Sequence, residues 1–190
     1  MKVLIISQYF WPENFKINDI TSDLCKKGHE ITVLTCDPNY PNKSLFVNYY
    51  SEKNKYKLFH KAKIIRVPII SRGNSRIQLF LNYISFFISA STIGIFKLKK
   101  NKYDKIFVFQ TSPATVIIPA LIISKTKKIP IIMWVLDLWP ETLVSMNVIS
   151  NKIIIKFFEY LMQQAYRRCN LILCQSKKIT KHINKGSKKK

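Results

Sequence analysis

The sequence predicts an α/β fold, a Rossmann-like open parallel sheet with helices on both faces. The chain has 190 residues, 47% of them hydrophobic, which is enough for one domain with a sizeable core. Short apolar runs alternate with longer segments of helical character, and strands separated by helices form a parallel sheet with right-handed crossovers. The runs are almost wholly apolar, as is typical of strands covered on both faces. They span residues 3–7, 31–35, 63–67, 105–110, 129–136 and 170–174.

The first run indicates a buried strand, because it lacks the length and the cleavage site of a signal peptide. A helix is expected over 14–27, with Ile17, Ile20 and Leu24 on one face. Gly28 is placed to end that helix, since glycine accepts the left-handed conformation of a helix end.

Two segments interrupt the alternation. Residues 37–62 are rich in tyrosine, asparagine and lysine and predict a long functional or mobile loop. Residues 77–96 carry no charge and are long enough to span a bilayer. A polar stripe nevertheless runs along this segment, and the segment lies where the sheet needs a crossover helix. We therefore expect a buried or membrane-grazing helix in preference to a membrane span. The stripe consists of Gln78, Asn82, Ser85, Ser89 and Thr92.

The second half of the chain continues the pattern, with helices expected over 113–124 and 151–168. The tail, 177–190, loses apolar periodicity and predicts a frayed, solvated end or the start of a linker to a second domain. The four cysteines are scattered and indicate reduced thiols in apolar surroundings, with no metal framework. They are Cys25, Cys36, Cys169 and Cys174.

The charge is strongly positive, with 32 Lys and Arg against 10 Asp and Glu, a net charge of +22. Such a charge suits nucleic acid, an anionic membrane leaflet or an anionic substrate. Nucleic acid is disfavoured because the basic residues are dispersed and no recognition motif is present. Residues 49–63 interleave aromatic rings with cations, as an interfacial segment does, although a solvated loop is an alternative.

Candidate site residues follow three strands, because ligands bind outside the carboxyl ends of an open parallel sheet. After the first strand comes Q-Y-F-W-P-E-N-F-K-I-N-D, where a helix start and Lys16 favour a phosphate, with an ordinary aromatic turn as the alternative. No G-x-G-x-x-G fingerprint is present. After the fourth strand, Thr111 or Ser112 is expected to cap a helix that begins at Pro113, in preference to contacting a ligand.

After the fifth strand comes D-L-W-P-E, the pattern with the clearest chemistry. Asp137 and Glu141 are two of only 10 acids, and they flank the large ring of Trp139. Carboxylates there orient sugar hydroxyls or accept a proton, and the ring offers a surface on which a sugar stacks. The alternative is that Asp137 only caps a helix and the tryptophan only packs.

Together these motifs resemble bacterial glycosyltransferases of family 4, and most closely the fucosamine-transferase-like enzymes of O-antigen and capsule assembly. W-P-E-N-F-K-I-N-D and D-L-W-P-E carry most of the likeness, which covers residues 1–176. The resemblance implies a GT-B architecture, in which an N-terminal domain binds the acceptor and a C-terminal domain binds the nucleotide-sugar donor. It also implies retention of the anomeric configuration, with no metal and no cofactor besides the donor substrate.

The resemblance further implies roles for individual residues. Asp137 and Glu141 would act on the acceptor hydroxyl, and Trp139, Thr111 and Ser112 would bind the acceptor. Asn14, Phe15 and Lys16 would face the donor diphosphate, in the place where the family usually carries a glycine pair. The histidine that many members have after the fifth strand is absent here.

The chain is short for the family, since the donor domain with its E-x7-E pattern would follow residue 176. The resemblance therefore implies an acceptor domain over 1–176 and a basic tail over 177–190 where a linker would begin. It also implies that the donor domain is absent, so that the chain would be truncated and inactive alone. It implies transfer of a sugar such as an N-acetyl-deoxyhexosamine to a lipid-linked acceptor, by a cytoplasmic protein peripheral to the anionic surface of the inner membrane. The alternatives are a non-catalytic membrane-associated module or remnant, and one subunit of a split transferase with a separately encoded donor domain.

Overall fold

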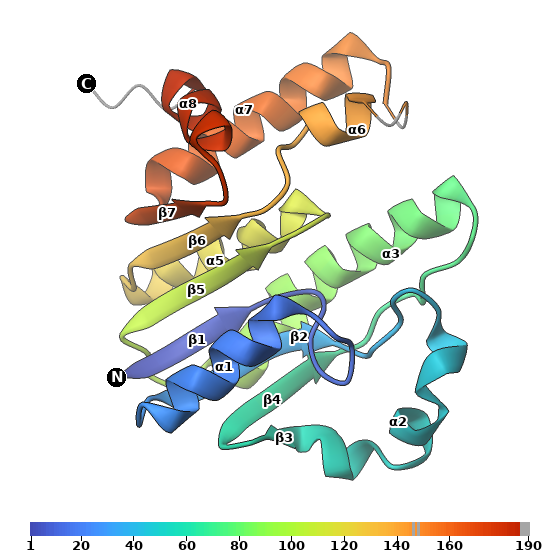
Figure 1. Ribbon diagram of the computed structural model, residues 1–190, viewed down its shortest axis with the longest axis vertical. Helices are drawn as coiled ribbons and strands as arrows, with labels where there is room; N and C mark the ends of the chain where they lie inside the picture. Colours follow the sequence, from blue (N-terminus) through green and yellow to red (C-terminus); the bar gives the residue numbers. More distant parts are fainter. Residues whose placement is uncertain (146, 148, 187–190) are drawn as a thin grey trace.

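A seven-stranded, mostly parallel sheet forms the centre of the molecule (Figure 1). The computed structural model describes residues 1–145, 147 and 149–186. The strand order is β3-β4-β2-β1-β5-β6-β7, and among these described strands only the β3–β4 pair is antiparallel. The predicted α/β fold class and its parallel sheet are confirmed. The strands are β1 (Lys2–Ile6), β2 (Glu30–Cys36), β3 (Leu58–Phe59), β4 (Ala62–Val67), β5 (Lys105–Gln110), β6 (Ile131–Val135) and β7 (Leu171–Cys174).

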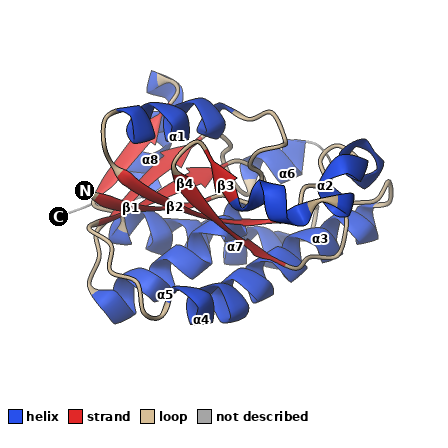
Figure 2. Cartoon of the chain, turned by 90° about the horizontal axis from the view of Figure 1, so that it is seen from below, coloured by secondary structure: helices blue, strands red, loops and turns tan. Residues whose placement is uncertain are grey.

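Helices cover both faces of the sheet (Figure 2). One face carries α1, and the other carries α3, α4, α5 and α7. Alternation along β1 divides the core accordingly, since Val3 and Ile5 point to the α1 layer and Leu4 and Ile6 to the opposite layer. The α-helices are α1 (Lys16–Lys26), α2 (Val47–Ser51), α3 (Arg76–Ser89), α4 (Ile95–Leu98), α5 (Ile117–Lys127), α6 (Glu141–Ser145), α7 (Lys152–Arg168) and α8 (Lys177–Gly186). The short turns are η1 (Lys43–Phe46), η2 (Lys53–Lys57) and η4 (Ala114–Val116), and η3 (Ala90–Gly94) is a π-helical turn.

The long segment after β2 is more ordered than its sequence predicts. It folds into η1, α2, η2 and the two-residue strand β3. Asp37 holds it together, because its carboxylate accepts a hydrogen bond from the Tyr49 hydroxyl and lies 2.8 Å from Lys53 Nζ. The prediction of a long unpatterned loop is wrong here, since the stabilising partners lie more than ten residues away and leave no local pattern.

The prediction of a frayed end is also wrong, as far as the tail is described. Residues 177–186 form α8, and Ile183 is buried against the core with Ile179 beside it. Two isoleucines four residues apart share one face of a helix, which is enough to dock this short element onto α7 and β7. The last four residues of the predicted tail, 187–190, lie outside the described residues.

The helix that the apolar segment predicts is continuous over α3, η3 and α4 and forms the crossover between β4 and β5. By length and composition, Arg76–Leu98 could cross a membrane. The helix instead packs along the sheet. The middle of its polar stripe points inward, since Asn82 is fully buried and bonds Gln8, Asn39 and the Ile70 carbonyl, while Gln78 and Thr92 at the two ends of the stripe are exposed. Large apolar side chains are left exposed on its outer side. They are Ile77, Phe80, Leu81, Ile88, Ile93 and Phe96.

Candidate functional site

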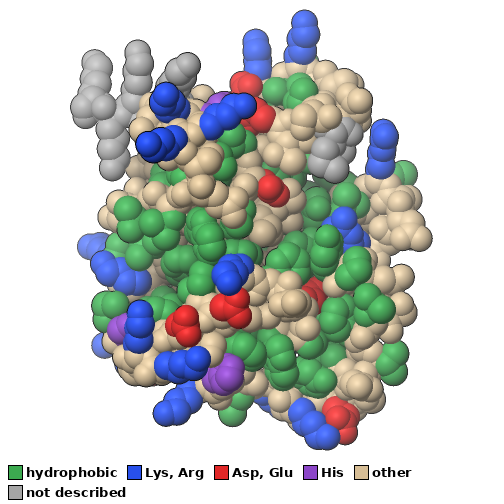
Figure 3. Space-filling view, viewed as in Figure 1, with side chains coloured by type: hydrophobic (Ala, Val, Ile, Leu, Met, Phe, Trp, Pro, Cys, Tyr) green, Lys and Arg blue, Asp and Glu red, His purple; other side chains and the backbone are tan. Residues whose placement is uncertain are grey.

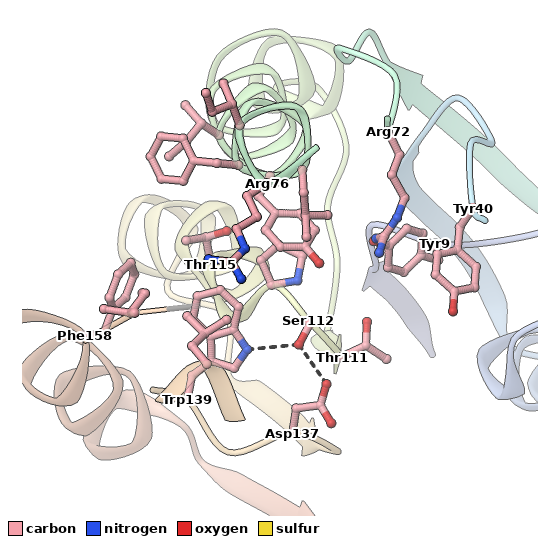
Figure 4. Close-up of a pocket in the computed structure, with 18 of the residues that line it drawn as sticks. Tyr9, Tyr40, Arg72, Arg76, Thr111, Ser112, Thr115, Asp137, Trp139 and Phe158 are labelled. Carbon is pink, nitrogen blue, oxygen red and sulfur yellow. Dashed lines mark hydrogen bonds between the residues drawn. The ribbon is translucent and has the colours of Figure 1, made fainter. Parts of the chain in front are cut away.

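A cavity of about 680 Å³ opens at the carboxyl edge of the sheet (Figure 4). The loops after β1, β4, β5 and β6 contribute Tyr9, Arg72, Ser112 and Asp137 to its lining. The start of α3 and the α6–α7 region complete the walls. The loop after β1 and the 137–141 loop therefore emerge at the same edge of the sheet, as parallel strands require.

Ser112 connects Asp137 and Trp139. Its hydroxyl donates to Asp137 Oδ2 at 2.9 Å and accepts a hydrogen bond from Trp139 Nε1 at 3.1 Å (Figure 4). The predicted capping role is wrong, because η4 begins after Pro113 and none of the described side chains caps it. The hydroxyl is committed to partners on the neighbouring loop, while Thr111 lines the cavity beside it.

Trp139 is held rigidly and is only 5% exposed. Its ring packs edge-to-face against Tyr83 and Phe158, at centroid distances of 6.4 and 5.5 Å. It lines the cavity, but this packing leaves little of the ring available for stacking on a sugar. Through its Nε1–H bond, Trp139 also orients the Ser112 hydroxyl.

Glu141 does not line the cavity. It begins α6, and its Oε1 lies 2.7 Å from His182 Nε2 on α8. Among the described lining residues, Asp137 is the only carboxylate. The structure thus separates the two acids that the sequence pattern groups together, because the helix that starts at Glu141 turns its side chain toward α8.

Of the three residues expected to face a diphosphate, Phe15 reaches the cavity. Its ring stacks on Tyr9, with centroids 4.9 Å apart and planes 10° apart. Lys16 instead pairs with Asp19 at 3.0 Å on the exposed side of α1. Asn14 is exposed and does not line the cavity.

Glu13 explains why this loop carries W-P-E. The carboxylate is 2% exposed and accepts hydrogen bonds from three backbone N–H groups: Asn39 and Tyr40 at 2.8 Å, and Phe10 at 3.1 Å. Burial raises the pKa of Glu13 to about 7, although these three N–H donors and the charge of Arg66 act to lower it. Glu13 therefore joins the loop after β1 to the loop after β2 and shapes the cavity without entering it.

Two arginines that the sequence pattern did not assign to a site lie in the cavity. Arg72 follows β4, and Arg76 begins α3 and projects inward in Figure 4. Arg72 Nη1 lies 3.3 Å from the Tyr9 hydroxyl, and its guanidinium carbon lies 5.0 Å from the Tyr40 ring centroid. Burial lowers the pKa of Arg72, but Tyr9 and Tyr83 raise it more, so this residue stays charged. Within the described part of the chain, neither arginine has a carboxylate within 4.0 Å.

Comparisons with known proteins bear on the fold. No protein-family model and no curated protein matches the sequence. Among solved structures, the chain is similar to CalG4, the calicheamicin glycosyltransferase, with a TM-score of 0.52 and 12% identity. The fold is shared with part of a glycosyltransferase. The likeness covers 86% of this chain and 42% of that one, so this chain spans less than half the length of the protein it matches. Membership of family 4 and of the O-antigen subgroup stays a prediction from the motifs.

Proposed function

We propose that this chain is the acceptor-binding domain of a glycosyltransferase that builds bacterial surface polysaccharide. It would hold a lipid-linked acceptor while a sugar, such as an N-acetyl-deoxyhexosamine, is transferred from a nucleotide sugar. The cavity at the carboxyl edge of the sheet, with Asp137 as its only described carboxylate, carries the proposal. The fold likeness to a glycosyltransferase supports it.

The chemistry centres on Asp137. Ser112 donates to its Oδ2, and Oδ1 accepts no hydrogen bond from the described residues, so that it can accept one from an acceptor hydroxyl. A carboxylate so placed orients that hydroxyl and takes up its proton as the hydroxyl oxygen bonds to the anomeric carbon of the donor sugar and the nucleoside diphosphate leaves. Thr111 adds a second hydroxyl on the same wall. Glu141 enters the proposal as a positioning residue, since it holds α8 through His182 instead of lining the cavity.

The donor would bind elsewhere. The proposal requires a nucleotide-sugar site on a donor domain, either in the same polypeptide or on a separate one, and it requires no metal. If no such domain exists, the chain would be a binding module that holds the acceptor without catalysing transfer.

Membrane attachment is part of the proposal, with the protein on the cytoplasmic surface of the inner membrane. The outer side of α3 exposes Phe80 and Ile88, and the first turns of α7 expose Ile153 and Phe157. Apolar side chains at a surface with net positive charge favour an anionic leaflet, where a well-placed lysine or arginine contributes about 1 kcal/mol. Lys and Arg are dispersed over the face shown in Figure 3, which suits a broad surface better than a nucleic-acid groove.

The test is glycan transfer in membranes from source cells that carry single-residue alleles. Incubation with labelled nucleotide sugars should yield labelled lipid, and Asp137→Ala should lower the rate by about a hundredfold or more, as loss of an acid–base group does. Asp23→Ala, which removes an exposed carboxylate from α1, is the matched control and should leave transfer unchanged. Equal rates for wild type and Asp137→Ala would contradict the assigned site. If deletion of the gene leaves every glycan of the source cells unchanged, the alternative of a non-catalytic remnant is favoured.

A further inference from the structure

We infer that Arg72 and Arg76 bind the phosphate groups of an isoprenoid-linked acceptor, while the apolar part of the same cavity holds the first isoprene units. This inference rests on the proposed function, which supplies a lipid-linked acceptor. It adds the phosphate subsite, the lipid groove and the direction in which the acceptor lies.

The cavity has two chemically different parts. One part carries the hydroxyls and charges of Tyr9, Arg72, Ser112 and Asp137. The other is formed by branched and aromatic side chains of α3, α6 and α7, namely Ile77, Phe80, Ile84, Leu143, Ile154 and Phe158. A ligand that fills both must combine a polar, anionic head with a hydrocarbon tail.

The arginines specify the head. A guanidinium offers a planar set of N–H donors that matches phosphate oxygens, and it stays charged at any physiological pH. Neither arginine has a carboxylate partner among the described residues, although both lie in a cavity with apolar walls. Arg72 is already oriented by the Tyr9 hydroxyl and the Tyr40 ring.

Thr115 supplies an independent indication of a polar ligand. This residue is 8% exposed and lines the cavity, yet its hydroxyl has no hydrogen-bond partner within the described structure. Arg76 lines the same cavity. The hydroxyl oxygen is sealed from solvent, so the side chains around it must shift before a phosphate oxygen held by Arg76 can reach it. Because a buried hydroxyl without a partner is costly, such a contact would offset part of the cost of that shift.

Charge sets the order of the ligand along the cavity. In Figure 4 Asp137 lies beside Ser112, apart from the helix start that carries Arg76. A phosphate would be repelled by the Asp137 carboxylate and attracted by the guanidinium groups. The phosphates therefore lie at the arginines, and the sugar attached to them extends toward Asp137, where its hydroxyl reacts.

The apolar part of the cavity continues onto the molecular surface. Ile77 and Phe80 line the cavity and are also 72% and 59% exposed. Ile154 does the same from α7, and its neighbour Ile153 is 79% exposed. This continuity lets a long isoprenoid chain run from the groove into a bilayer, so that only its phosphate end has to leave the membrane.

The experiment measures binding of farnesyl diphosphate to the purified full chain by calorimetry, with inorganic diphosphate and farnesol as the two half-ligands. Farnesyl diphosphate should bind at least about tenfold more tightly than either half, since both parts of the cavity contribute. Arg72→Gln and Arg76→Gln should each weaken binding by about tenfold or more, as loss of a charge-assisted hydrogen bond does. Lys156→Gln removes one exposed charge from α7 outside the cavity and should have no effect.

The groove has its own matched pair of variants. Phe80→Ser changes an exposed residue that lines the cavity. It should weaken the binding of farnesyl diphosphate while leaving the binding of inorganic diphosphate unchanged. Phe96→Ser changes a 77% exposed residue at the far end of the same helix and should leave the affinity for both ligands unchanged. Both sites are exposed, so neither change should disturb folding.

Several results would overturn the inference. Equal affinity for farnesyl diphosphate and inorganic diphosphate would leave only an anion site. Binding unaffected by both arginine variants would leave only an apolar site. If a short-chain phosphatidylglycerol binds as tightly as farnesyl diphosphate and displaces it, the assignment of an isoprenoid ligand is wrong. Failure of the proposed function is distinguishable, because loss of the Asp137 effect on transfer would leave farnesyl diphosphate binding intact.

Discussion

The tripeptide Trp-Pro-Glu occurs twice, at 11–13 and at 139–141, and both copies lie at the carboxyl edge of the sheet. In the first copy the glutamate is 2% exposed and accepts three backbone hydrogen bonds, while the tryptophan packs half-buried on Tyr56 and Phe59. In the second copy the arrangement is reversed. Trp139 is buried and hydrogen-bonded, and Glu141 has a 41% exposed side chain that faces His182. The same three residues therefore stabilise one loop through the acid and the other through the ring.

Replacing each of the two glutamates should reveal this difference as the largest difference in the free energy of unfolding. Glu13→Ala leaves two buried N–H groups and one partly buried N–H group without an acceptor. At about 1–3 kcal/mol for each unsatisfied group, the free energy of unfolding should fall by about 3 kcal/mol or more. Glu141→Ala removes a partly exposed contact with His182 and should cost less than about 1 kcal/mol. Urea unfolding of both variants measures the two values. Similar losses would show that the two copies serve the same structural purpose.

The pH dependence of stability sharpens the comparison. The pKa of Glu13 is raised from its ordinary 4.5 to about 7, so between these pH values the folded state holds a proton that the unfolded state has released. The contribution of Glu13 to stability is therefore complete below pH 4.5 and is lost as the pH rises through 7, by about 3 kcal/mol in total. Urea unfolding from pH 4.5 to 8 should show this loss in wild type and not in Glu13→Gln. Parallel profiles for the two proteins would mean that the carboxyl is ionised throughout.

The tryptophans provide the smallest test. Trp139→Phe removes the Nε1–H bond to Ser112 and should cost about 1 kcal/mol more than Trp11→Phe, whose indole N–H has no partner among the described hydrogen bonds. Urea unfolding at a fixed pH compares the two variants. Equal costs would assign the effect of Trp139 to packing against Tyr83 and Phe158 alone.

The parallel strands could be predicted from sequence because each is a short apolar run, and burial on both faces leaves that pattern locally. The two-residue strand β3 and helix α8 were missed, since Leu58–Phe59 is too short to show alternation and Ile179 and Ile183 supply only one repeat. The polar stripe on the crossover helix was visible in the sequence. The burial of Asn82 within that stripe was not, because the partners of Asn82 come from loops 43 and 74 residues away.

The candidate site shows the same division. Asp137, Ser112, Thr111 and Trp139 were predicted, since each follows a strand and strand ends share one edge of a parallel sheet. Arg72 and Arg76 were visible only as charges flanking an apolar segment. Their place in the cavity depends on how the crossover helix begins.

The sequence by itself determined the alternation of strands and helices and the edge at which polar residues gather, because both follow from local apolar pattern and from the geometry of parallel strands. Tertiary structure alone decided that Glu13 is a buried acceptor, that Glu141 turns to α8 and that two arginines enter the cavity. Side-chain burial and hydrogen-bond partners are set by segments distant in the chain, and no local pattern records them.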